Sequence, residues 1–267
     1  MEQTHTDLSL RPEPLDAALL SRVEDACLNA SAPPQQRWLD GWLLRLSPGK
    51  ARRARSVHAL APGRLSLEAR LAQSDVVCRE SGLPLIFRIT PFTHPAELDA
   101  ELAQRGFVLA DETLVMVCPS LPGEAEPLPP GLVLEQPGHA AFADLVGALR
   151  GAPAEHRRSH AERLTLSPVP YQGWVLRRDD TVMACAQTAR EGRFIGLYDV
   201  FVAPQARGRG LSRRLCSALL ASAGSSGARL GYLQVQADND PAIAVYRRLG
   251  FVEGYRYHYR GRPGQTS

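Results

Sequence analysis

A glycine-rich segment in the second half of the chain combines residues that suit an anion-binding turn. Residues 201–212 read Phe-Val-Ala-Pro-Gln-Ala-Arg-Gly-Arg-Gly-Leu-Ser and lie between a predicted strand and a predicted helix. Glycines at 208 and 210 allow a tight turn and let backbone N–H groups approach a ligand, because glycine has no Cβ. The first N–H groups of a helix are unpaired, and the helix dipole favours an anion there. With Arg207 and Arg209 adding positive charge, the segment predicts a pyrophosphate site.

Two better-known phosphate motifs are missing. The sequence contains no Gly-x-Gly-x-x-Gly, the fingerprint of dinucleotide-binding domains. Gly49-Lys50 lacks the earlier glycine and the following Ser or Thr of a Walker A loop. The sequence therefore argues against hydride transfer and nucleotide hydrolysis as functions of this protein.

The elements that would position this turn alternate between strands and helices. The predicted strands cover 131–135, 173–177, 182–189, 194–202, 230–235 and 251–259, and the predicted helices cover 139–150, 154–166, 240–249 and a segment from Leu211 to the glycine-rich 224–227. Strands flanked by helices in this order predict an α/β (α+β) domain with a mixed sheet.

The turn and its neighbours resemble the GNAT superfamily of acetyl-CoA-dependent N-acetyltransferases. Gln205-Ala-Arg-Gly-Arg-Gly210 matches the signature Gln/Arg-x-x-Gly-x-Gly/Ala, and Val202-Ala-Pro204 precedes it. The segments 233–239 and 242–251 follow at the spacing of the family. The resemblance covers about residues 131 to 259. It implies a GNAT-like mixed sheet flanked by helices, acetyl-CoA as cosubstrate, no metal, and an amine as acceptor.

The resemblance also implies roles for single residues. A backbone N–H near Val200 to Val202 would polarise the thioester carbonyl, and Tyr246 would protonate the departing thiolate. Asn239, two helical turns before Tyr246, would contact the pantetheine or the acid's hydroxyl. The alternatives are a core aromatic for Tyr246 and a helix cap for Asn239. The residues expected to bind the coenzyme are Val200, Phe201, Val202, Gln205, Arg207, Gly208, Arg209, Gly210, Leu211, Ser212, Asn239 and Tyr246.

An amine acceptor must lose a proton before it reacts. A primary amine with a pKa of about 10 arrives protonated, and only its neutral form attacks a thioester. Asp199, on the strand beside the reacting centre, is the first candidate for the base, although a bulge there leaves its direction open. Glu155, His156 and His160 on the 154–166 helix are further candidates, and so is a water chain. The two histidines lack the intervening glutamate of a His-Glu-x-x-His site, so a solvated helix face is expected for them.

A Pro- and Gly-rich segment, 119–131, divides the chain and predicts a linker. We expect domains over 1–120 and 131–267, joined by 121–130. Residues 95–108 echo residues 239–252, with the two Gly-Phe pairs 144 positions apart, which indicates two tandem GNAT-like copies. Chance similarity is the alternative, since a helix followed by Gly-Phe and a strand is a common ending.

The N-terminal copy is expected to be degenerate. Leu102 and Pro95 stand at the positions of Tyr246 and Asn239, and the stretch after Pro62 lacks the paired glycines. A leucine cannot donate a proton. This region would therefore serve as scaffold or as part of the acceptor pocket. Residues 40–45 and 53–57 resemble the first domain of some tandem members.

The composition of the chain indicates whether it folds and in which cellular compartment it is expected. With 44% hydrophobic and 22% charged residues, the chain can bury a core and is not expected to be disordered. It has no apolar stretch of membrane-spanning length and begins with a polar segment, which predicts a soluble, cytoplasmic protein. The five cysteines form no Cys-x-x-Cys pair and are expected to be reduced and buried.

Several functions stay open beside acetylation of a small-molecule amine. The acceptor could instead be a protein lysine or N-terminus, or the chain could be a non-catalytic acyl-CoA sensor. A nucleic-acid role rests only on the basic cluster Lys50–Arg55 and ranks last, because the net charge is just +3 and no recognition helix accompanies the cluster. A homodimer is also left open.

Overall fold

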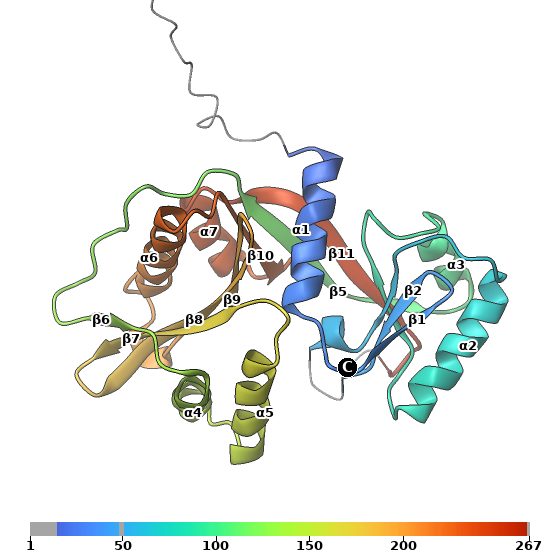
Figure 1. The fold of residues 1–267 in the computed structure, drawn as a ribbon, viewed down its shortest axis with the longest axis horizontal. Helices are drawn as coiled ribbons and strands as arrows, with labels where there is room; N and C mark the ends of the chain where they lie inside the picture. Colours follow the sequence, from blue (N-terminus) through green and yellow to red (C-terminus); the bar gives the residue numbers. More distant parts are fainter. Residues whose placement is uncertain (1–14, 48–50, 266–267) are drawn as a thin grey trace, which may run out of the picture.

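The computed structural model describes residues 15–47 and 51–265, and a single sheet of eleven strands runs through this part of the chain (Figure 1). The strands are β1 (Gln36–Leu39), β2 (Trp42–Arg45), β3 (Val57–Ala59), β4 (Ile86–Ile89), β5 (Val108–Cys118), β6 (Val133–Glu135), β7 (Tyr171–Arg178), β8 (Thr181–Glu191), β9 (Phe194–Val202), β10 (Leu230–Gln236) and β11 (Val252–Gly261). Their order across the sheet is β1-β2-β3-β4-β11-β5-β10-β9-β8-β7-β6. The predicted mixed α/β fold is confirmed.

The helices cover both faces of this sheet. They are α1 (Ala17–Ala30), α2 (Leu67–Glu80), α3 (Leu98–Gln104), α4 (His139–Leu149), α5 (Ala154–Thr165), α6 (Leu211–Ser225) and α7 (Asp240–Arg248), with short 3₁₀ helices η2 (Arg52–Ala54) and η3 (Pro204–Ala206). Around the C-terminal strands, α6 and α7 lie on one face, while α4 and α5 lie on the other and α1 stands between the two halves (Figure 1). Among the described residues, no helix is long and apolar enough to span a membrane.

The two halves of the chain exchange strands. β5, from the first half, lies between β10 and β11 and is antiparallel to both. β11, the last strand, also pairs with β4 of the first half. Each half has the same order of elements, β3-α2-β4-α3-β5 and β9-α6-β10-α7-β11, with a parallel first pair of strands in each. The division into 1–120 and 131–267 stays a prediction, because in space the strands of the two regions are interleaved.

The predicted linker has no helix or strand, but it lies along α6. The backbone N–H of Glu126 donates to the hydroxyl of Ser217 at 2.9 Å, and its carboxylate pairs with Arg213 at 3.0 Å. Arg214 donates to the carbonyl of Pro127 at 3.1 Å. The segment is therefore tied to the helix that follows the glycine-rich turn.

Alternating side chains of the central strands supply two cores. Leu197 and Leu233 face α6 and α7, whereas Tyr198 and Tyr232 face α1, α4 and α5. All five cysteines are buried and form no disulfide, as expected. Burial raises the pKa of the Cys185 thiol to about 12, so this thiol stays protonated and unreactive at neutral pH.

A buried ion pair between α1 and β4 is also bound by a tyrosine from the second half. The guanidinium of Arg88 on β4 donates to both carboxylate oxygens of Glu24 on α1, and Tyr255 of β11 donates its hydroxyl to the same carboxylate. The side chains of Arg88 and Glu24 are 2% and 4% exposed. Each charge depends on its partner, because neither reaches water.

Removal of this carboxylate is expected to destabilise the fold strongly. Glu24→Gln leaves the Arg88 guanidinium buried without a counter-charge, which costs about 3 kcal/mol of unfolding free energy. Urea unfolding measures this loss. Glu101→Gln is the control, since Glu101 pairs with Arg105 on the surface of α3 and should cost less than about 1 kcal/mol. Equal losses for the two variants would contradict the assignment.

Candidate active site

The glycine-rich turn connects β9 to α6 through η3. Gly208 and Gly210 have φ angles of 76° and 69°, in the left-handed region that favours glycine. Gly210 is the N-cap of α6, and no side chain caps the helix there. The first N–H groups of α6 therefore lack both intrahelical and capping partners, and the residues from Arg207 to Gly210 are exposed. This is the geometry that an anion site requires.

The side chains predicted to bind the coenzyme around the turn differ in the contacts that they can make with a ligand. Arg207 and Arg209 are exposed, and Arg207 donates to the carbonyl of Val202 at 3.4 Å while its guanidinium lies 5.8 Å from the ring of Phe201. Leu211 is only 3% exposed and packs into the core, so it can offer a ligand only its backbone. Gln205 is exposed and Ser212 is half-buried.

Next to the turn, the parallel strands β9 and β10 separate. They pair from Phe194 and Leu230 to Leu197 and Leu233, and no pair joins them beyond that point. Both strands continue, β9 paired with β8 and β10 paired with β5. The facing backbone edges of β9 and β10 are thus left open where the two strands diverge, and an extended ligand could pair with them.

A bulge in β9 coincides with this separation. Tyr198 pairs with Gln187 and Phe201 with Cys185, so Asp199 and Val200 together face a single residue of β8. Asp199 has a φ of 54°, which is unusual for a residue with a side chain. The bulge expected at Asp199 is present, and it turns the carboxylate toward α4 and α5.

Asp199 is part of a polar cluster with Arg150, Gln187 and His160, which we call the Asp199 cluster. One carboxylate oxygen accepts a bond from Arg150 at 2.6 Å, and the other accepts from the amide of Gln187 at 3.1 Å. The same amide nitrogen lies 2.7 Å from Nε2 of His160. Gln187 is 1% exposed, so its two N–H groups are committed to these two acceptors.

His160 does not lie on a solvated helix face, so that expectation is wrong. Its ring packs edge-on against Phe142, with centroids 5.8 Å apart, because α5 folds back onto the sheet. Burial, reinforced by the positive charge of Arg163, lowers the pKa of His160 to about 4, so the imidazole is neutral at pH 7. His156 on the same helix is exposed, as expected, and so is Glu155.

Tyr246 lies on α7, and Asn239 is the N-cap of the same helix. Tyr246 is half-buried, with its ring 6.0 Å from that of Phe251, and its hydroxyl makes no hydrogen bond to any residue the structure describes. Burial raises the pKa of Tyr246, and the nearby Cys216 adds to the shift. The phenol is therefore protonated at neutral pH. Asn239 caps α7 by accepting from the N–H of Ala242 at 3.2 Å, and its amide nitrogen stays available to donate to a ligand.

Arg150 and Gln187 were not among the predicted site residues. In the sequence, Arg150 was identified only as the last residue of the helix predicted over 139–150. Gln187 carried a signal, because it is the one amide in the apolar run 182–189. A polar side chain in a buried strand needs hydrogen-bond partners, and here they are Asp199 and His160.

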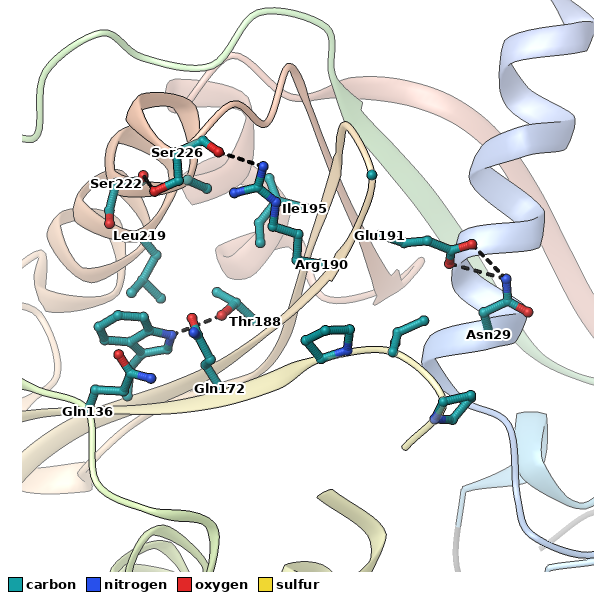
Figure 2. Close-up of a pocket in the computed structure, with 16 residues that line it drawn as sticks. Asn29, Gln136, Gln172, Thr188, Arg190, Glu191, Ile195, Leu219, Ser222 and Ser226 are labelled. Atoms are coloured by element: carbon teal, nitrogen blue, oxygen red, sulfur yellow. Dashed lines mark hydrogen bonds between the residues drawn. The ribbon is translucent and has the colours of Figure 1, made fainter. Parts of the chain in front are cut away.

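A separate cleft of about 990 Å³ lies beside the second half of α6 (Figure 2). It is lined by Trp174, Thr188, Arg190, Glu191, Ser226 and neighbouring residues. Its charges are engaged, since Arg190 donates to the Ser226 carbonyl at 2.6 Å and Glu191 accepts from Asn29 at 2.9 Å. None of the predicted site residues lines this cleft, because the glycine-rich turn is at the opposite end of α6.

The fold and the turn define an acetyltransferase-type domain, and residues 139–251 match the model of the "Acetyltransferase (GNAT) family". The chain carries a GNAT acetyltransferase domain. The sequence is 26% identical over 231 residues to the "Uncharacterized N-acetyltransferase YobR" of Bacillus subtilis, covering 84% of this chain and 91% of that protein. Two further curated relatives are matched over only 25% and 28% of their own length.

Solved structures share the fold. A GCN5-related N-acetyltransferase from Kribbella flavida superposes with a TM-score of 0.69 at 19% identity, over 92% of this chain and 96% of that one. A tandem GNAT protein from the clavulanic acid biosynthesis pathway gives a TM-score of 0.61 at 17% identity, over 77% of this chain and 73% of that one. At these identities the likeness concerns the fold alone.

Proposed function

We propose that this protein is an acetyl-CoA-dependent N-acetyltransferase that acetylates a primary amine of a small molecule. One observation carries the proposal: the unpaired N–H groups at the start of α6 lie next to the point where β9 and β10 separate. A diphosphate at the turn would leave the rest of an extended coenzyme free to run along the open edge of β9. Arg207 and Arg209 add charge for the phosphates.

In the proposed reaction, the neutral amine attacks the thioester carbonyl directly. A nitrogen–carbon bond forms, and the carbon–sulfur bond breaks. A backbone N–H of Val200 to Val202 donates to the carbonyl oxygen as it gains charge. The departing thiolate takes a proton from the Tyr246 hydroxyl, which is protonated and has no other partner among the described residues. As the amide forms, the attacking nitrogen loses a proton through water, and this proton restores the Tyr246 hydroxyl.

The ammonium proton goes to Asp199, directly or through water. Arg150 and Gln187 hold the carboxylate in one orientation, toward the side of the sheet that carries α4 and α5. His160 supports this arrangement through Gln187 and is a positioning residue in this proposal. A carboxylate with both oxygens engaged can still accept a proton through its remaining lone pairs.

We also propose that the first half is a degenerate tandem copy, with the boundary at 121–130. The repeated order of elements supports this, as does the position of Leu102, which is fully buried where Tyr246 would stand. This half would then serve as scaffold and as one wall of the acceptor pocket. The cytoplasmic location and a homodimer stay predictions.

Release of free thiol from acetyl-CoA over a panel of small amines tests the proposed function. The wild-type protein is expected to turn over at least one amine class, and Asp199→Asn should lower kcat by about 100-fold with coenzyme binding retained. Coenzyme binding without thiol release for any amine between pH 6 and 10 would support the acyl-CoA sensor instead. Turnover of peptides but not of small amines would assign a protein lysine or N-terminus as acceptor.

A further inference from the structure

The basic cluster Lys50–Arg55 does not form an open basic surface over its described residues. Lys50 lies outside the described residues. Arg52 is paired with Asp111 of β5, and Arg53 points toward the C-terminal half. The guanidinium carbon of Arg53 lies 5.7 Å from the centre of the Tyr198 ring. Tyr198 directly precedes Asp199, so η2 brings a cation from the first half next to the candidate active site.

Within residues 15–47 and 51–265, Arg53 forms no ion pair with a carboxylate. Its electrostatic neighbours are four tyrosines, Tyr171, Tyr198, Tyr257 and Tyr259. Burial raises the pKa of Tyr171 to about 12 and raises that of Tyr198 well above its ordinary value, so these phenols are neutral at pH 7. Arg53 is half-buried, so part of this residue stays accessible to solvent. Such a charge favours an anionic partner.

Two further arginines strengthen the positive potential. Arg45 donates to the Leu28 carbonyl at 2.7 Å at the end of α1, and Arg88 is paired with Glu24. Arg45 interacts electrostatically with Arg88 and with Arg53. Glu24 interacts with Arg45 and is paired with Arg88, and its oxygens are already bound by Arg88 and Tyr255. The excess positive charge remains at Arg53.

Gln234 provides an unused donor on the same side of the sheet. It lies on β10 just past the point where β10 leaves β9. Its amide oxygen accepts from the Tyr257 hydroxyl at 2.8 Å, while its amide nitrogen is buried and has no partner among the described residues. A guanidinium and an amide N–H suit a group that only accepts hydrogen bonds, and a carboxylate is such a group.

We propose that the acceptor amine also carries a carboxylate, which Arg53 binds beside the reacting centre. The inference rests on the proposed function and narrows its substrate class to amino acids and related amino carboxylates. Because Tyr198 and Asp199 are adjacent in β9, the two charged ends of one small molecule could be held by Arg53 and Asp199 together. Arg53 would then determine specificity, whereas Asp199 would act on the amine.

Matched acceptors test the proposal. Thiol release from acetyl-CoA is measured for a panel of α- and ω-amino acids, each beside its own carboxamide, which keeps the size and removes the negative charge. The wild-type protein should favour at least one amino acid over its carboxamide by about 10-fold or more in kcat/KM. Arg53→Gln should lower kcat/KM for that amino acid by about 10- to 100-fold, mainly through KM, with the carboxamide changed less than about 3-fold. Arg53→Lys should retain part of the preference, and exposed Arg64→Gln should retain all of it.

Three outcomes would overturn the proposal. These are no preference for any amino acid, a preference for the carboxamides, or an equal loss for both acceptors in Arg53→Gln, which would indicate a structural role. If no amine releases thiol, the proposed function fails. The carboxylate site is then tested separately, by calorimetric titration of the same amino acids into the coenzyme-saturated protein. Binding that Arg53→Gln weakens by about 10-fold would support the site, and absence of binding would refute it.

Discussion

Gly210→Asp is expected to abolish measurable binding of acetyl-CoA, with affinity reduced by at least about 100-fold. Gly210 has a φ of 69°, and a Cβ at this position would lie 3.1 Å from the guanidinium of Arg214. The new carboxylate would also place a negative charge at the N-terminus of α6, where the diphosphate is proposed to bind. It would cap the unpaired N–H groups and repel the phosphates.

Calorimetric titration with acetyl-CoA measures the effect, and Gly82→Asp is the matched control. Gly82 also has a left-handed backbone, with a φ of 67° just after α2, but it lies in the half without the paired glycines. The control therefore introduces the same strain and charge and should bind the coenzyme normally. Normal binding by Gly210→Asp would show that the turn is not the coenzyme site.

Tyr246→Phe is expected to lower kcat by about 100-fold while the affinity for acetyl-CoA stays within about 3-fold of wild type. General acid catalysis typically contributes two to four orders of magnitude. The hydroxyl is the only group removed, and burial keeps its pKa above the ordinary value, so it is a proton donor over the whole neutral range. The assay is steady-state thiol release with a saturating amine.

The fold should tolerate this change. The Tyr246 hydroxyl has no hydrogen-bond partner among the described residues, and the ring contact with Phe251 is retained in the variant. The unfolding free energy is therefore expected to change by less than about 0.5 kcal/mol. An unchanged kcat would assign Tyr246 to packing alone, and the thiolate would then leave unprotonated or take its proton from water.

Local signals in the sequence were sufficient for most of the C-terminal elements. The strand predicted over 194–202 has the same bounds as β9, and the helix predicted from Leu211 begins where α6 begins. Both follow from apolar periodicity ended by glycine or proline, which are properties of neighbouring residues. The glycine-rich turn is local in the same sense, because two glycines at 208 and 210 determine its backbone.

The strand exchange between the halves could not be read from local patterns. β5 and β11 each show a strand pattern, but nothing in either segment specifies that β5 lies between β10 and β11. Pairing partners depend on contacts between residues more than a hundred positions apart, as between Val117 and Val252. A repeat in the sequence indicates two similar units, but it does not specify which strands of the two units pair with each other.

The sequence by itself determined the family, the glycine-rich turn and the residues of α7, because each depends on residue types at short, fixed spacings. Only the tertiary structure brought together Arg150, Gln187 and His160 around Asp199, and placed Arg53 against Tyr198. These side chains come from separate elements, and the packing of α4, α5 and η2 against β8 and β9 decides which of them meet. Chemistry that depends on one local motif can be predicted from the chain, whereas chemistry assembled across elements requires their positions in space.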